Sequence, residues 1–113
     1  MITIFHNPRC TKSREGLQIL EKSGKDFEVV KYLEESISEA QLKKIIALLG
    51  IQPINLVRKN EAIWKSDFKG KELNDKDVIS AMIKNPKLIE RPIVINNNKA
   101  VIGRPPSLIL DII

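Results

Sequence analysis

The chain has 113 residues, of which 42% are hydrophobic, 4% aromatic and 29% charged, and its net charge at neutral pH is +5. This length is enough for one hydrophobic core and too short for two, so we expect a single domain over residues 1–113. No stretch approaches the roughly 20 apolar residues of a membrane span, and the first residues lack a signal-peptide pattern, which predicts a cytoplasmic protein without a membrane partner.

The first part of the chain has the pattern of a strand, a helix and a second strand. Residues 2–5 form a short apolar run that predicts a buried strand, and a turn over residues 7–10 follows it. A helix is expected from about Thr11 to Gly24, because glycine is common just past a helix end. Residues 27–33 are rich in β-branched and aromatic side chains and predict the second strand. This order predicts a βαβ unit with parallel strands.

The middle of the chain, approximately residues 36–90, has the pattern of helices. Ser38 and Gln41 have the spacing of a capping box, and leucine and isoleucine recur at helical intervals after them. Asn74 is expected to cap another helix, which stops near Asn85. Short helical turns are expected between these two helices. We therefore expect a helical insertion in this part of the domain.

The last third of the chain returns to strands. Residues 92–95 and 100–102 predict two strands joined by a turn at 96–98, where three asparagines tolerate left-handed backbone geometry. The prolines at 105–106 suit the first turn of a final helix over 107–112. The order β-α-β, helices, β-β-α predicts an α/β protein of the thioredoxin-like fold with a helical insertion between its halves.

Cys10 is the only cysteine of the chain. It cannot form a disulfide within the chain, and with a single histidine the soft ligands are too few for a zinc site. Cys10 lies at the turn before the first helix, where backbone N–H groups and the helix dipole favour a thiolate. Arg9, Lys12 and Arg14 add positive charge nearby. This setting predicts a nucleophile rather than an inert buried thiol.

Four other side chains around the turn are candidates for supporting roles. Ser13 follows Cys10 by three residues and is placed to donate a hydrogen bond to the sulfur. His6 ends the first strand, where its imidazole either tunes Cys10 or is a half-buried structural histidine. Asn7 and Pro8 are expected to shape the loop.

Three later arginines stand out by their context. Arg91 precedes Pro92 at the start of a strand, where the peptide bond is a candidate for the cis isomer. Arg104 follows the predicted hairpin, and Arg58 follows an apolar stretch. In a thioredoxin-like fold the loops of Arg91 and Arg104 can approach the turn of Cys10. Guanidinium groups there would bind a tetrahedral oxyanion. From the residues alone, surface salt bridges are the alternative for each arginine.

Four separated segments, in the same order over essentially the whole chain, resemble the glutaredoxin-dependent arsenate reductases. They are HNPRCTKSR at 6–14, LVRKN at 56–60, NPKLIERPIV at 85–94 and GRP at 103–105. The resemblance implies a thioredoxin-like fold with a helical insertion. It also implies that Cys10 is the nucleophile that attacks arsenic, while His6 and Ser13 support its thiolate. It implies three oxyanion-binding arginines, namely Arg58, Arg91 and Arg104.

The resemblance further implies arsenate as substrate, glutathione as co-substrate and glutaredoxin as partner, with no metal and no bound organic cofactor. The single cysteine agrees with this scheme, because no second thiol of the chain can resolve an adduct on Cys10 and the next sulfur must come from outside. Lysine and arginine are scattered along the chain rather than gathered in one tract, so we expect no nucleic-acid partner. We expect the protein to act as a monomer.

Two other functions fit the same fold, and a third is excluded. An Spx-type regulator would bind RNA polymerase, although many such proteins carry a Cys-x-x-Cys pair whose second position is Ser13 here. A glutathione-dependent thiol-disulfide reductase would use Cys10 on another substrate and would not need three arginines. A cysteine phosphatase is excluded because only three residues, none of them glycine, separate Cys10 from Arg14.

Overall fold

A computed structural model describes all residues 1–113, and the chain divides into two compact units. The first unit comprises Met1–Glu35 and Arg91–Ile113, and the second comprises Ser36–Glu90. The second unit thus covers the residues over which the sequence predicts a helical insertion. None of the helices combines the length and the apolar composition that crossing a membrane requires.

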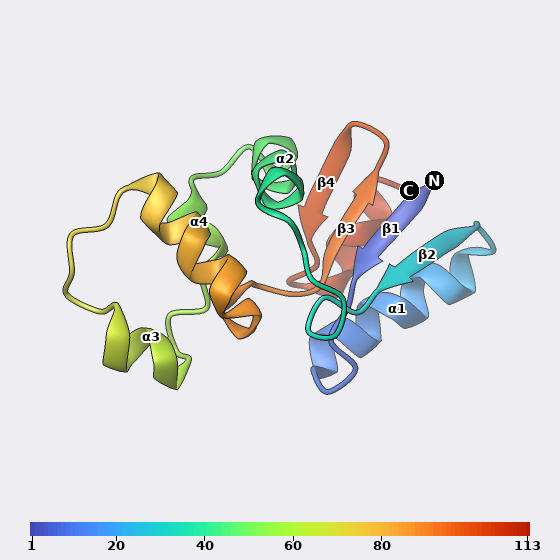
Figure 1. The fold of residues 1–113 in the computed structure, drawn as a ribbon. Coiled ribbons are helices and arrows are strands. Elements are labelled where there is room, and N and C mark those ends of the chain that lie inside the picture. The colour runs from blue at the N-terminus through green and yellow to red at the C-terminus, as the bar shows by residue number, and fades with distance from the viewer. The chain divides into compact units, whose positions relative to one another are not determined.

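The first unit is built on a four-stranded sheet of order β2-β1-β3-β4 (Figure 1). β1 (Ile2–Phe5) pairs in parallel with β2 (Phe27–Val30) and antiparallel with β3 (Ile93–Asn96). β3 pairs antiparallel with β4 (Lys99–Ile102). The helix α1 (Thr11–Ser23) connects the two parallel strands. This arrangement confirms the predicted βαβ unit, the predicted hairpin and the thioredoxin-like fold.

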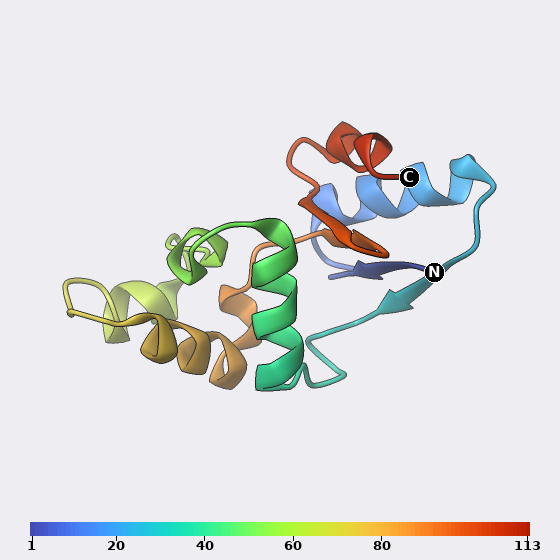
Figure 2. The ribbon, with the colours of Figure 1, turned by 90° about the horizontal axis from the view of Figure 1, so that it is seen from above.

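Two helices cover the same face of this sheet, as Figure 2 shows: α1 and the 3-10 helix η3 (Pro106–Asp111). The core of the unit lies between them and the sheet, because alternate side chains of a strand point to the same face. Its buried members are all aliphatic and come from α1, β1, β3 and η3: Ile2, Ile4, Leu20, Val94 and Ile109.

Local sequence signals explain where most elements of the first unit end. α1 ends at Gly24, whose φ of 74° is the left-handed conformation that glycine adopts without strain. Asn97, with φ 56°, occupies the turn between β3 and β4. β2 is shorter than predicted and ends at Val30, because a hydrogen-bonded turn begins at the next residue. In this turn the N–H groups of Glu34 and Glu35 both donate to the carbonyl of Lys31.

The second unit is helical, and its elements in chain order are α2 (Glu39–Leu49), η1 (Pro53–Leu56), α3 (Ala62–Asp67), α4 (Asp75–Lys84) and η2 (Pro86–Leu88). Ser38 and Gln41 form the predicted capping box at the start of α2, and Asn74 forms another with Asp77 at the start of α4. An isolated bridge between Val57 and Ile89 joins the segments that follow η1 and η2.

Candidate active site

Cys10 lies at the end of the loop between β1 and α1 and is the N-cap of α1. Its N–H donates to the carbonyl of Asn7 at 3.0 Å, and its own carbonyl accepts from the N–H of Arg14 at 3.0 Å. Its side chain is partly exposed. The loop therefore holds the backbone of Cys10 on both sides and leaves the residue partly exposed.

Two guanidinium groups of the first unit contact this sulfur. Nη2 of Arg104 lies 3.5 Å from Sγ of Cys10, and the side chain of Arg91 also hydrogen-bonds Cys10. Nε of Arg104 donates to the backbone carbonyl of Arg91 at 2.8 Å, which orients the guanidinium plane. Both arginines precede cis-prolines, Pro92 and Pro105. The structure thus brings Arg91 and Arg104 together at Cys10, although both arginines are far from Cys10 in the sequence.

The pKa of the Cys10 thiol is lowered. Burial has the largest single influence and by itself raises the pKa. The backbone N–H of Ser13, the hydrogen bond from Arg91 and the positive charges of Arg91 and Arg104 all favour the thiolate, and together they outweigh burial. The sulfur makes no close capping hydrogen bond, so the Ser13 N–H acts mainly as a nearby dipole. More of Cys10 is therefore thiolate at neutral pH than is usual for a cysteine.

We expect this thiolate to be visible in alkylation kinetics. A lowered pKa means that the thiolate persists to lower pH, so the alkylation rate of Cys10 with iodoacetamide should have its midpoint below that of an unstructured peptide with residues 6–14. Arg91→Ala should move the midpoint upward, because it removes a hydrogen bond and a charge. Lys22→Ala, in the last turn of α1, is the control. Equal midpoints for protein and peptide would contradict the lowered pKa.

Ser13 is fully buried, and its hydroxyl serves two neighbours other than the sulfur. Its Oγ lies 2.6 Å from Nδ1 of His6 and accepts from the backbone N–H of Asn7 at 3.0 Å. The part of Ser13 that favours the thiolate of Cys10 is therefore its backbone N–H and not its hydroxyl. The hydroxyl ties α1 to the end of β1.

Ser13→Ala is expected to destabilise the protein by about 1–3 kcal/mol, because it leaves the buried N–H of Asn7 and Nδ1 of His6 without their partner. The free energy of unfolding, measured by urea titration, checks this. Ser66→Ala, at an exposed position of α3, is the matched control and should change stability by less than about 0.5 kcal/mol. Equal stabilities of the two variants would show that the hydroxyl of Ser13 stabilises nothing.

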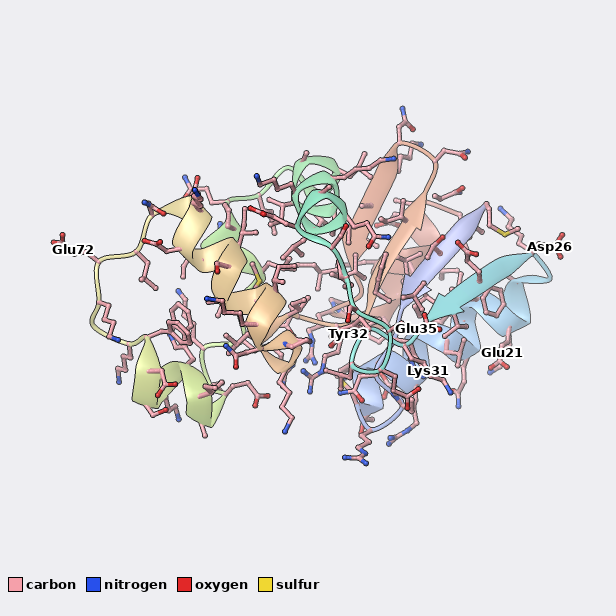
Figure 3. The ribbon with its side chains drawn as sticks, in the orientation of Figure 1. Glu21, Asp26, Lys31, Tyr32, Glu35 and Glu72 are labelled. Atoms are coloured by element: carbon pink, nitrogen blue, oxygen red, sulfur yellow. The ribbon has the colours of Figure 1, made fainter.

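His6 is buried directly after β1, and its backbone N–H donates to the carbonyl of Val30. The pKa of His6 is lowered, first by burial and then by the positive charges of Lys31 and Arg14, which outweigh a hydrogen bond with Ser13. Figure 3 labels Lys31 just past the end of β2. A neutral imidazole held by Ser13 favours the structural alternative for this histidine.

The side chains of Asn7 and Arg14 stabilise the loop between β1 and α1. Oδ1 of the buried Asn7 accepts from the N–H of Arg9 at 3.0 Å. Nη1 of Arg14 donates to the carbonyl of Pro8 at 3.0 Å, and its Nη2 donates to Oγ1 of Thr11 at 3.2 Å. The sequence indicates the loop-shaping role of Asn7 but presents Arg14 only as a charge, since its contacts depend on how the loop folds.

Arg58 belongs to the second unit, where two carboxylates surround it. Its Nη1 lies 2.8 Å from Oε1 of Glu90, and its Nε lies 3.3 Å from Oε1 of Glu61. Burial lowers the pKa of Arg58, but the charge of Glu90 and the hydrogen bonds to both carboxylates outweigh this and raise it. The guanidinium is thus charged and already paired. Its place in the oxyanion site stays a prediction, because Arg58 and Cys10 lie in different units.

The chemistry of the assembled residues is that of a nucleophile in a cationic setting. The two guanidinium groups beside the thiolate attract an oxyanion and donate hydrogen bonds to its oxygens. No group of three or more histidine, cysteine, aspartate or glutamate side chains is placed to hold a metal ion. The arrangement therefore suits attack by sulfur on the central atom of a tetrahedral oxyanion.

The chain is similar to known proteins along nearly its whole length. Residues 5–112 match the sequence profile of the ArsC family. The uncharacterized protein YfgD of Escherichia coli (strain K12) is 44% identical over 99% of this chain and 96% of its own. An arsenate reductase of Haemophilus influenzae is 39% identical over 99% and 98%. The solved structure of the arsenate reductase from Vibrio cholerae has a TM-score of 0.94 and 42% identity, covering 99% of this chain and 97% of that one.

Proposed function

This chain belongs to the ArsC family, and we propose on that premise that it is an arsenate reductase in which Cys10 is the nucleophile and glutathione and glutaredoxin supply the electrons. The observation that carries the proposal is the placement of two guanidinium groups, from Arg91 and Arg104, at one sulfur whose pKa is lowered. Relatives named arsenate reductase support the substrate.

In the proposed first step, the thiolate of Cys10 attacks the arsenic of arsenate. A sulfur–arsenic bond forms, one arsenate oxygen takes up two protons and leaves as water, and arsenic stays in its +5 state. Arg91 and Arg104 hold the remaining oxygens and neutralise charge that builds up on them during the attack. Their hydrogen bonds favour the transition state over the free ion where that charge is greatest.

The electrons for reduction come from two external thiols. Glutathione attacks the adduct on Cys10, glutaredoxin then reduces the resulting species, and arsenite leaves. Over the full cycle the two external thiols lose two electrons and join as one disulfide, arsenic gains those two electrons, and one oxygen is released as water. Cys10 is regenerated as a thiol. The single cysteine of the chain supports this scheme, because the protein itself has no resolving thiol.

A coupled assay tests the proposal. The purified protein is mixed with arsenate, glutathione, glutaredoxin, glutathione reductase and NADPH, and both NADPH oxidation and arsenite release are recorded. We expect both signals, in equal amounts and dependent on arsenate. Arsenite release with another thiol system alone would keep the reductase and correct its electron donor. With no arsenite from any thiol system the proposal fails, and reduction of a small mixed disulfide or retention of RNA polymerase then favours the alternative functions.

A further inference from the structure

A glycine lies in the interior of α1 where neither a turn nor a helix end needs one. Gly16 is buried in the middle of Thr11–Ser23, and its φ is not in the left-handed region. Glycine is among the least favourable residues in a helix interior, because it has the most backbone freedom to lose. Its presence here calls for a reason in the packing of the helix.

The reason is the close approach of two side chains. A Cβ on Gly16 would lie 2.9 Å from Cδ1 of Ile109 and 3.0 Å from Cγ of Pro92. A second buried glycine, Gly103, meets the same pair: its Cβ would lie 2.9 Å from Cγ of Pro92 and 3.2 Å from Cδ1 of Ile109. The ring of Pro92 is therefore packed between two positions at which even a methyl group would require it or Ile109 to move.

This packing connects three parts of the site. Gly16 is on the helix whose N-cap is Cys10, while Pro92 and Gly103 are the immediate neighbours of Arg91 and Arg104. Gly103 also donates its N–H to the carbonyl of Pro92 at 2.8 Å, so the two arginine segments are joined at this point. Pro92 is thus packed against α1 at the point where the segments of the two arginines meet.

We propose that Gly16 and Gly103 are positioning residues, whose missing side chains let the segments of Arg91 and Arg104 approach α1 closely enough for both guanidinium groups to reach Cys10. Only the kinetic consequence of this inference rests on the proposed function. A methyl group at either glycine would push the ring of Pro92 outward, and with it the backbone that carries the arginines.

Gly16→Ala tests the inference with two readouts. The pH midpoint of Cys10 alkylation should rise, because the hydrogen bond and charge of Arg91 and the charge of Arg104 would act on the sulfur from farther away. The kcat/KM for arsenate should fall by about 10- to 100-fold, as expected when a site is displaced by an ångström or less. Gly103→Ala should change both quantities in the same direction.

Two further variants separate positioning from simple loss of stability. Gln18→Gly weakens α1 at an exposed position away from Pro92 and should leave the alkylation midpoint unchanged even though the protein melts earlier. Ile109→Val removes Cδ1, one of the two atoms that the new methyl group of Gly16→Ala would meet, and so gives the helix room to move away from Cγ of Pro92. Combining the two changes should therefore bring the midpoint part of the way back toward the wild type. Coupling of this kind is the signature of residues in contact.

The outcomes distinguish this inference from the proposed function. If Gly16→Ala and Gly103→Ala both keep the wild-type alkylation midpoint, the inference is wrong whatever their activity. An equal rise of the midpoint in Gln18→Gly would also overturn it, because the effect would then follow stability. If Gly16→Ala alone does not fold, Gly103→Ala and the double variant with Ile109→Val decide. If the wild-type protein does not reduce arsenate, the proposed function is wrong. The pH midpoints of Cys10 alkylation in the glycine variants still test the inference in that case.

Discussion

Cys10→Ser is expected to abolish arsenate reduction while the protein stays folded. A serine hydroxyl has a far higher pKa than a thiol, and the dipole and charges around position 10 cannot produce an alkoxide at neutral pH. Loss of a covalent nucleophile lowers turnover by up to the order of a million-fold, so the measured rate should fall to background. The coupled assay and direct arsenite measurement check this.

The fold should tolerate this change because the thiol side chain contributes little to the core. Cys10 is partly exposed, and its two loop hydrogen bonds use only backbone atoms. We expect the thermal midpoint of Cys10→Ser to stay close to that of the wild type. Lys22→Ala, at the other end of α1, is a control for effects of handling and should keep full activity. Arsenite release by Cys10→Ser at more than a few per cent of the wild-type rate would show that another group attacks arsenic.

The elements that sequence patterns predict correctly are those that local physics determines. The capping boxes at Ser38 and Asn74 each need only a polar side chain and its partner three residues on. The end of α1 at Gly24 needs only a residue that adopts a positive φ. The position of Cys10 before a helix follows in the same way from its neighbours. The thiolate-favouring dipole could therefore be predicted from the sequence alone.

The parts of the site that sequence patterns miss depend on residues far apart in the chain. The hydroxyl of Ser13 contacts His6 and Asn7, which follow β1, and the spacing of Ser13 to Cys10 does not reveal these partners. The contact of Arg104 with the backbone of Arg91 exists only once β3 and β4 have paired. In the same way, a glycine such as Gly16 is visible in the sequence, but the ring packed against it is not.

Arg104→Lys is expected to be nearly as damaging as Arg104→Ala, although lysine keeps the positive charge. The guanidinium of Arg104 uses Nε on the carbonyl of Arg91 and Nη2 on Cys10, two donors in a fixed planar fork. A lysine ammonium is a single point that cannot occupy both places at once. We therefore expect each variant to lose about 2–4 kcal/mol of transition-state stabilisation in kcat/KM for arsenate, the usual effect of removing one oxyanion donor.

The pH midpoint of Cys10 alkylation should separate the two variants where the activity does not. Arg104→Ala removes the charge of Arg104 from the sulfur and should raise the midpoint, whereas Arg104→Lys keeps a positive charge nearby and should raise it less. Lys22→Ala removes the same charge from a distant point and should change neither quantity. If Arg104→Lys reduced arsenate at the wild-type rate, charge alone would be sufficient at position 104, and the hydrogen bond to Arg91 would have no part in placing the donor.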